Sequence, residues 1–421
     1  MVSRRRVVGY DFQRGKEYGK NGIKFLVQRK EGMDFRLTPE QLELRKAARD
    51  FAEREFPAIA RECDREEVFP LDLLQKACRS GLVGIFVDKE YGGRGFGYLE
   101  NAIVMEEFWR VDPGLGSQVM CACFGSEMIL LKGSEEQKRK YLPPICNGEA
   151  ISAVAVTEPD AGSDVLSVST RADRKGDGYL INGSKMFTSN GDIANFLVAL
   201  CLTNPDETSP YERHSVMIIE TDRPGLRRNK LRGKMGIRAH DTAEISLSDV
   251  WVPEENLIGG EGKGFNCFME FFNRSRAYVA AQGVGVAQGA LEMALEYVRR
   301  SDQSGRSLSF FEIVQSRLAE MATLTEAARN LVYKAAWMLD RGQVEPALIS
   351  MAKWYAGEVG VRVANESLQL HGECGYFNDY DIGRFYRDAK IVEIYEGTKE
   401  VEKLVIARQL LKGKWGKPPV E

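Results

Sequence analysis

The hydrophobic periodicity of this chain changes twice, and these changes constrain its fold more than any other sequence feature. In residues 33–150, apolar side chains recur at the three-to-four-residue spacing of helices. Residues 151–263 carry short β-branched runs separated by turn dipeptides such as Asn-Gly and Asp-Gly. Helical spacing returns at Gly264 and persists to about Lys412. This order predicts an α+β protein with segregated helices and strands.

The ends of several elements are marked in the sequence. Thr38 is expected to cap a helix, with Pro39 at its first position and Gln41 completing a capping box. Further helices are expected over residues 71–78, 99–109, 134–141, 287–299, 310–341, 345–370 and 398–411. Antiparallel strands are expected over residues 151–156, 179–181, 195–202, 215–219 and 243–247. We therefore predict four segments, namely a basic N-terminal extension (1–32), an N-terminal helical domain (33–150), a central β domain (151–263) and a C-terminal helical bundle (264–421).

The first 32 residues differ from the rest in charge. They hold nine Lys or Arg against three Asp or Glu, and since the net charge of the chain is −3, the remaining residues carry about −9. They lack the apolar stretch of a secretory signal, and one Ser with three acids does not fit a transit peptide. We interpret them as an extension upstream of a natural start at Met33. We expect a cytoplasmic protein, with the mitochondrial matrix as the second choice.

Composition argues against several classes of function. A net charge of −3 supplies no basic excess for nucleic acid, and no run of about 18 apolar residues predicts a membrane span. His214, His240 and His371 are scattered, which does not indicate a metal site. Eight cysteines without a Cys-x-x-Cys pair predict reduced thiols. Acid–base chemistry is therefore expected to depend on carboxylates or on a cofactor.

The sharpest motif spans Arg387–Thr398, in which Glu396 directly precedes Gly397. Glycine lets the backbone bend and a substrate approach closely, and Thr398 can cap a helix beginning at Lys399. Glu396 is therefore expected on a connecting turn. A single Glu is most often a solvated surface charge, and spacing alone does not decide between that reading and a catalytic base.

Two further motifs combine hydroxyl groups with turns. Residues 156–164 (VTEPDAGSD) follow an apolar strand and present hydroxyls with backbone N–H groups, which suits a phosphate or the polar edge of a ring cofactor. Residues 183–191 (GSKMFTSNG) place an aromatic side chain beside hydroxyls at a strand end. By composition alone, a capped surface turn and an ordinary hairpin explain these motifs at least as well.

Together, in this order and spacing, the motifs resemble the acyl-CoA dehydrogenase family over residues 33–413. Supporting signatures are residues 91–93 (YGG), 234–239 (KMGIRA), 250–253 (VWVP), 276–283 (RAYVAAQG) and 369–372 (QLHG). The resemblance implies a helical N-terminal domain, a central β domain and a C-terminal four-helix bundle, assembled as a homotetramer. It also implies FAD between the β domain and the bundle, with its adenosine end reaching the neighbouring subunit.

The resemblance further implies the chemistry. Family members remove a proton from the carbon next to a thioester carbonyl and pass a hydride from the β carbon to flavin N5. The position that matches the usual base is Glu396, and the electrons leave to an electron-transferring flavoprotein. This reaction requires no histidine, which agrees with the scarcity of histidine in the chain.

Matching positions imply contacts to both ligands. The expected cofactor contacts are Val156, Thr157, Gly162, Ser163, Phe187, Thr188, Ser189, Gln369, Gly372, Thr398 and Glu400. Among these, Val156 and Thr157 match the pyrimidine edge of the flavin, and Phe187 stands where the family usually has Trp. The expected contacts to the CoA ester are Ser163, Asn273, Arg276 and Gly397. No metal ligand is expected.

The sequence departs from the family pattern where FAD is usually gripped from the partner subunit. An Arg-x-x-Phe-Gly motif is replaced by residues 301–305 (SDQSG), a following Gln by Glu312, and a Gly by Glu373. Because a cation and an aromatic ring are lost near a diphosphate, FAD is expected to be held more loosely or by other cations. The substitute cations near this segment are Arg299, Arg300 and Arg306.

A second departure is Asp88, which stands where the family usually has Pro. It lies in residues 87–93, a stretch that resembles the border of the acyl pocket. Since alicyclic members of the family can use an Asp base, Asp88 is a second candidate catalytic acid. The alternative is a solvated loop charge paired with Lys89.

The sequence thus predicts FAD-dependent α,β-dehydrogenation of a short, branched or alicyclic acyl-CoA, for example of the cyclohexane-carboxyl-CoA type. Two alternatives stay open. A glutaryl-CoA-type dehydrogenase would need a pocket cation that the sequence does not identify. A redox-inactive, CoA-ester-binding member of the family would need no flavin.

Overall fold

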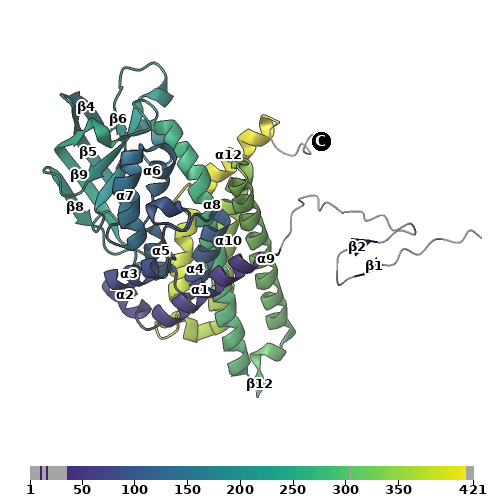
Figure 1. Ribbon diagram of the computed structural model, residues 1–421. Helices are drawn as coiled ribbons and strands as arrows, with labels where there is room; N and C mark the ends of the chain where they lie inside the picture. Colours follow the sequence, from purple (N-terminus) through teal and green to yellow (C-terminus); the bar gives the residue numbers. More distant parts are fainter. Residues whose placement is uncertain (1–9, 12–15, 18–35, 304, 414–421) are drawn as a thin grey trace, which may run out of the picture. The chain divides into compact units, whose positions relative to one another are not determined.

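A computed structural model describes residues 10–11, 16–17, 36–303 and 305–413 (Figure 1). The chain divides into two compact units, residues 1–42 and 43–421. Most of the basic extension lies outside the described residues; within it, strands β1 (Tyr10–Asp11) and β2 (Lys16–Glu17) pair antiparallel. The predicted capping box is confirmed, because the Thr38 N–H donates to Gln41 Oε1 (2.9 Å) and the Gln41 N–H donates to Thr38 Oγ1 (3.2 Å).

The first helical domain continues with helices of 7 to 17 residues. They are α1 (Pro39–Glu55), α2 (Ala60–Glu66), α3 (Leu71–Arg79), α4 (Tyr98–Val111), α5 (Pro113–Cys121), α6 (Ser126–Lys132) and α7 (Glu135–Asn147). Helices α5 and α6 were not predicted, because their continuous apolar sequence has no amphipathic period. The stretch Pro113–Lys132 is apolar enough to cross a membrane, with mean hydropathy 1.3, but 83% of that window is buried inside the protein, as in a core segment.

The central domain is one sheet with the strand order β10-β7-β6-β4-β5-β9-β8. Its strands are β3 (Ser152–Ala155), β4 (Arg171–Lys175), β5 (Gly178–Ser189), β6 (Phe196–Leu202), β7 (His214–Glu220), β8 (Leu226–Lys230), β9 (Thr242–Pro253) and β10 (Leu257–Ile258). The predicted antiparallel pairing holds for most neighbours, but β3 pairs parallel to β6, from Ser152 beside Phe196 to Ala155 beside Ala199. Strand β3 can pair parallel to β6 because the connection between them is long and includes β4 and β5.

The C-terminal domain is built on long helices, separate from the strands in Figure 1. The long helices are α8 (Gly264–Arg300), α9 (Glu312–Asp340) and α10 (Pro346–His371), and the shorter helices α11 (Ile382–Ala389) and α12 (Lys399–Leu411) follow them. Helix α8 begins 23 residues before the predicted 287–299 segment and packs closely on α10. A Cβ at Gly283 would lie 2.3 Å from the Ala356 carbonyl oxygen, so only glycine permits this approach.

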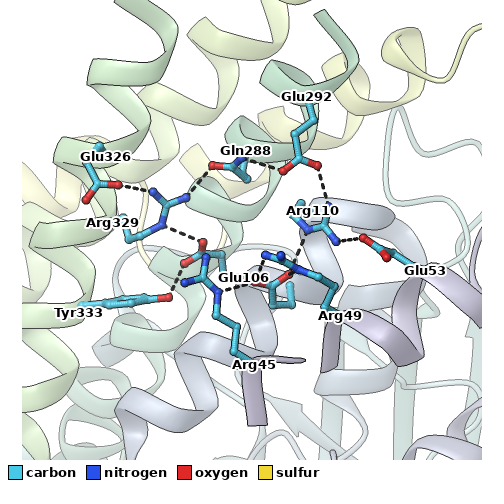
Figure 2. Close-up of polar contacts among 11 residues, drawn as sticks. Arg45, Arg49, Glu53, Glu106, Arg110, Gln288, Glu292, Glu326, Arg329 and Tyr333 are labelled. Atoms are coloured by element: carbon cyan, nitrogen blue, oxygen red, sulfur yellow. Dashed lines mark hydrogen bonds and ion pairs between the residues drawn. The ribbon is translucent and has the colours of Figure 1, made fainter. Parts of the chain in front are cut away.

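A buried charge network joins the N-terminal helices to the bundle (Figure 2). Glu107 of α4 is fully buried and accepts from Arg45 Nε (2.8 Å) and Arg49 Nη2 (2.9 Å) of α1. Its neighbour Glu106, 1% exposed, accepts from Arg329 Nε of α9 at 2.9 Å. The guanidinium groups overcome burial and lower the pKa of Glu107. These contacts fix α4 against α9 and so hold the two helical domains together.

Candidate active site

A cavity of about 600 Å³ lies between the sheet and the bundle. Its walls come from the loop after β3, the end of β5, the loop between β8 and β9, helix α8, and residues 387–401. Cavities of this size, mostly apolar with a few converging polar groups, are typical ligand sites. The three motifs that the sequence analysis singled out therefore meet at one place.

Glu396 lies on the predicted turn and lines this cavity. The Ser275 hydroxyl of α8 donates to Glu396 Oε2 at 2.6 Å. The backbone of Glu396 has φ 55° and that of Gly397 has φ 105°, both in the left-handed region. Helix α12 starts directly after the turn, capped by Thr398, whose hydroxyl accepts from the Val401 N–H at 3.4 Å.

Buried charges hold the Glu396–Gly397 turn from behind. Arg276 Nε donates to the Glu396 carbonyl oxygen at 2.9 Å, and the Lys353 ammonium of α10 donates to the Gly397 carbonyl oxygen. Glu402 pairs with Arg276 at 3.1 Å. A Cβ at Gly397 would lie 2.0 Å from Glu402 Oε1, so a side chain at this position would displace the cluster. These contacts offset the cost of a left-handed Glu.

Enclosure sets the acidity of the carboxyl group. Burial raises the pKa of Glu396 above its ordinary 4.5, and the hydrogen bond from Ser275 with the charges of Arg276 and Lys353 opposes this rise. The side chain is half-buried because one side faces the cavity, while protein surrounds its other sides. Burial also lowers the pKa of Lys353 to about 8. The turn thus presents a carboxylate that is a stronger base than one in water.

The structure brings most of the predicted ligand contacts to the cavity. The predicted residues that line it are Val156, Thr157, Gly162, Ser163, Phe187, Ser189, Arg276, Glu396, Gly397 and Thr398. They come from four separate parts of the chain.

Other predicted contacts lie outside the cavity lining. Thr188 is 1% exposed and points to the opposite side of β5 from Phe187 and Ser189, as strand alternation requires. Glu400 is exposed on α12, and Asn273 lies one turn before Arg276 on α8.

Gln369 and Gly372 also fall away from the cavity, and helix geometry explains why. Both are exposed at the C-terminal end of α10, whereas Lys353 supports the Glu396 turn near its N-terminal end. The 16 residues between Lys353 and Gln369 span about 24 Å at the rise of an α-helix. Within one chain, these two ends of α10 cannot reach the same small group.

Asp88 is not brought to the cavity, contrary to the hypothesis that it points inward. It is exposed and precedes the short helical turn Lys89–Tyr91. The loop folds on itself, since the Gly93 N–H donates to the Asp88 carbonyl oxygen at 3.3 Å and the Gly95 N–H to that of Val87 at 2.8 Å. This turn buries Val87 and directs the next side chain to solvent.

Several residues of the site escaped the sequence analysis. They are Ser275, Lys353 and Glu402 around the turn, and His240 and Gln282 on the cavity wall. One signal was available for Lys353, because it is the only charged residue in the mostly apolar segment 348–354 (LISMAKW). Such a Lys on a buried helix face needs a buried partner. The others are common residue types with no distinctive spacing.

The lining residues fit a flat ring cofactor. Phe187 is 65% exposed, and its backbone lies in the left-handed region at φ 56°. Its aromatic ring lines the cavity together with Thr157 and Ser189, which carry hydroxyl groups. No atom lies within 4 Å of a Cβ built on Gly162, so the loop that follows β3 leaves open space. Apolar faces with hydroxyls at one edge match the two faces and the polar edge of a flavin.

Among the described residues, six non-glycine residues have positive φ, and three of them line this cavity. These are Phe187, Ile237 (φ 41°) and Glu396. Left-handed backbone at non-glycine residues costs about 1–3 kcal/mol each and concentrates at functional sites. The distribution of strain therefore marks the same cavity as the motifs do.

Comparison with known proteins shows which family this chain resembles along most of its length. The N-terminal, middle and C-terminal domains of acyl-CoA dehydrogenases match residues 38–149, 153–250 and 262–411. The chain is 42% identical over 392 residues to the acryloyl-CoA reductase (NADH) of Anaerotignum propionicum, covering 93% of this chain and 99% of that protein. It is also 42% identical over 385 residues to the short-chain specific acyl-CoA dehydrogenase of Clostridium acetobutylicum, covering 90% and 100%.

A solved structure agrees. A chain of a structure described as the electron transferring flavoprotein of Acidaminococcus fermentans superposes with a TM-score of 0.88 and 40% identity, covering 90% of this chain and 100% of that chain. The protein therefore belongs to the acyl-CoA dehydrogenase family. Members of this family are oxidoreductases that act on the CH–CH bonds of acyl-CoA thioesters, as the sequence motifs predicted.

Proposed function

We propose that this protein is an FAD-dependent dehydrogenase of a short, branched or alicyclic acyl-CoA, with Glu396 as the base. The observation that carries the proposal is the Glu396 carboxylate, held by Ser275 on the wall of a cavity that also presents the flavin-edge motifs. When bound, FAD supplies the acceptor for the hydride that leaves the β carbon. The thioester carbonyl acidifies the α C–H, so the protein must supply a base and alignment.

The residues of the chain divide this work. Glu396 accepts the α proton, and its raised pKa brings its basicity closer to that of the acidified C–H. Arg276 and Lys353 hold the backbone on either side of the carboxylate, so that its position does not depend on a flexible loop. Val156, Thr157, Ser163, Ser189 and Thr398 would hold FAD, with Phe187 against its ring.

The proposal includes a second subunit. Gln369 and Gly372 lie too far from the cavity to contact the same end of FAD within one chain, which supports a homotetramer in which they meet the adenosine end from a neighbour. Arg299, Arg300 and Arg306 remain predicted cations for the diphosphate in place of the family motif. An electron-transferring flavoprotein is the proposed electron acceptor, and the cytoplasm is the proposed location.

A second candidate function is reduction of a 2-enoyl-CoA by the same site. One relative is named an acryloyl-CoA reductase, and a carboxyl group with a raised pKa is protonated over a wider pH range, as a proton donor requires. The redox-inactive alternative predicts a different spectrum, because such a protein would show no flavin absorbance after addition of FAD.

The visible spectrum of the purified protein tests the proposal. We expect a flavin spectrum that is bleached anaerobically by a saturated acyl-CoA, across a panel of linear, branched, cyclic and dicarboxylic esters. Bleaching only by a chemical reductant, followed by reoxidation with a 2-enoyl-CoA, would favour the reductive direction. Absence of flavin absorbance even after FAD addition would contradict both functions.

A further inference from the structure

The Lys and Arg side chains that line the cavity are not equally neutralised. Three of them form ion pairs, namely Arg276 with Glu402 (3.1 Å), Arg387 with Asp64 (2.7 Å) and Lys390 with Glu393. The fourth, Lys234, lies in the loop between β8 and β9 and forms no ion pair with any residue that the structure describes. Lys234 therefore adds a positive charge to the cavity wall that no neighbouring carboxylate cancels.

The ammonium group of Lys234 is held in place by uncharged acceptors. It donates to the His240 carbonyl oxygen and to Thr242 Oγ1, the latter at 3.1 Å. These two bonds fix the position of the charge without neutralising it. The side chain is half-buried, and burial lowers the pKa of Lys234 to about 8, an effect that the negative charge of Asp241 opposes. At pH 7 the protonated form of Lys234 therefore predominates.

Sheet register places this charge beside the residues that we propose for the flavin ring. Thr242 is the direct partner of Ser189 across β5 and β9, and both residues line the cavity. The Cβ atoms of such opposed residues are about 4.5–5.5 Å apart. Phe187, two residues before Ser189 on β5, lines the same cavity. The ammonium group of Lys234 is thus one hydrogen bond away from the partner of Ser189.

The same charge is not part of the carboxylate cluster. The charges that act most strongly on Glu396 are those of Arg276, Lys353 and Glu402, all on the helical side of the cavity. Lys234 approaches from the β domain instead. Its charge therefore acts on the ring side of the site, and removing it leaves the contacts around Glu396 in place.

A fixed cation at this position affects the redox equilibrium. When the β carbon gives up a hydride and Glu396 takes the α proton, the ring system gains two electrons and one proton, so its reduced form carries one more negative charge than its oxidised form. A nearby positive charge stabilises the reduced form more than the oxidised one. Because Lys234 is half-buried, solvent ions screen its charge less than they screen a surface charge.

We propose that Lys234 raises the reduction potential of the bound flavin and so favours oxidation of the saturated ester over reduction of the 2-enoyl ester. This inference rests on the proposed function. It assigns the direction of the reaction, which the proposed function leaves between two candidates, to the charge of one residue outside the Glu396 turn.

The reduction potential of the purified, flavin-loaded protein at pH 7 tests the proposal. It is measured from the visible spectrum during reduction in equilibrium with a redox dye, without any CoA ester. Lys234→Gln removes the charge but keeps a donor, and Lys234→Met removes both, so either folded variant is sufficient. We expect the equilibrium constant for reduction to fall about tenfold or more, which lowers the potential of this two-electron couple by about 30 mV or more.

Two control variants separate the charge from its surroundings. Lys234→Arg keeps the positive charge, so its equilibrium constant for reduction should stay within about threefold of the wild-type value. Lys175→Gln removes an exposed positive charge from β4, away from the cavity lining, and should change the constant by less than about twofold. Titration of each variant with FAD shows whether binding of the oxidised cofactor changes as well.

Several results would overturn the inference while leaving the proposed function intact. A wild-type potential in the uncharged variants would show that Lys234 does not act on the ring. If those variants lose FAD while Lys234→Arg keeps it, or bind FAD more weakly at an unchanged potential, the charge serves the diphosphate instead. If they lose affinity only for dicarboxylic esters, it serves a substrate carboxylate.

Failure of the proposed function would look different from all of these results. A wild-type protein that shows no flavin absorbance after addition of FAD, or whose flavin no CoA ester reduces or reoxidises, would contradict the proposed function itself. The inference about Lys234 would then fail with it.

Discussion

Glu396 and Asp88 are both acids beside glycine-containing turns, yet the fold treats them in opposite ways. Asp88 precedes a surface turn and faces solvent, whereas Glu396 lies on a cavity wall with its backbone held by Arg276 and Lys353. The two positions share an acidic side chain and a turn, so these two features are not sufficient to make a residue a catalytic base. The difference is enclosure by α8, α10 and α12, which raises the pKa of Glu396 and fixes its position.

The largest expected effect comes from removing the enclosed carboxylate. Glu396→Gln keeps the size and the Ser275 contact but loses the base, so we expect the rate of anaerobic flavin bleaching by acyl-CoA to fall about a thousandfold. The flavin spectrum of the resting enzyme should be unchanged, which serves as the control for folding and cofactor. Bleaching at the wild-type rate would transfer the catalytic role to another group.

A smaller loss is expected when the clamp behind the turn is weakened. Lys353→Met fills the same space but removes the donor to the Gly397 carbonyl oxygen. We expect kcat to fall roughly ten- to a hundredfold with little change in KM, since a small misplacement of the base is costly. Lys334→Met, an exposed Lys on the outer face of α9, is the matched control. Equal kcat values in the two variants would show that the clamp has no role.

The pH dependence of the rate follows from the same contacts. The rate should fall as the pH drops through the pKa of Glu396, and this acid limb should lie above 4.5 because burial raises that pKa. Lys353 favours the ionised form, so Lys353→Met should move the limb to still higher pH. Because these pKa values belong to the enzyme without substrate, pH profiles of kcat/KM for both enzymes measure the shift. A limb at or below 4.5 in the wild type would contradict the enclosure argument.

The smallest effect is expected at the exposed acid. Asp88→Asn should change kcat/KM by less than about twofold, since surface substitutions away from special features have little effect. If Asp88→Asn lost as much activity as Glu396→Gln for any ester in the panel, the conclusion that the exposed acid has no catalytic role would be wrong.

Much of the fold could be predicted because strong local patterns agree with it. The runs 195–202 and 215–219 became β6 and β7, two neighbouring strands that are buried along nearly their whole length. The sequence gives no such signal for β4 (RADRK) and β8 (LRRNK), whose side chains are mostly exposed and charged. These strands form because their backbones pair with neighbours, β4 with β5 and β8 with β9.

The candidate site was predictable only in part. Glu396 and its turn followed from Gly397 and the Thr398 cap, which are local signals. Lys353 and His240 were missed because their partners lie far away in the sequence, 44 residues from Lys353 to Gly397 and 123 from His240 to Ser117. Such contacts depend on how distant segments pack in three dimensions, which periodicity does not encode.

The left-handed backbone at Phe187, Ile237 and Glu396 has a consequence for engineering this protein. A search for thermostable variants would favour Gly or Asn at these positions, since either relieves the strain. All three side chains form the cavity wall, so each stabilising substitution would remove part of the site. Heat resistance gained at these positions would therefore come with lost turnover.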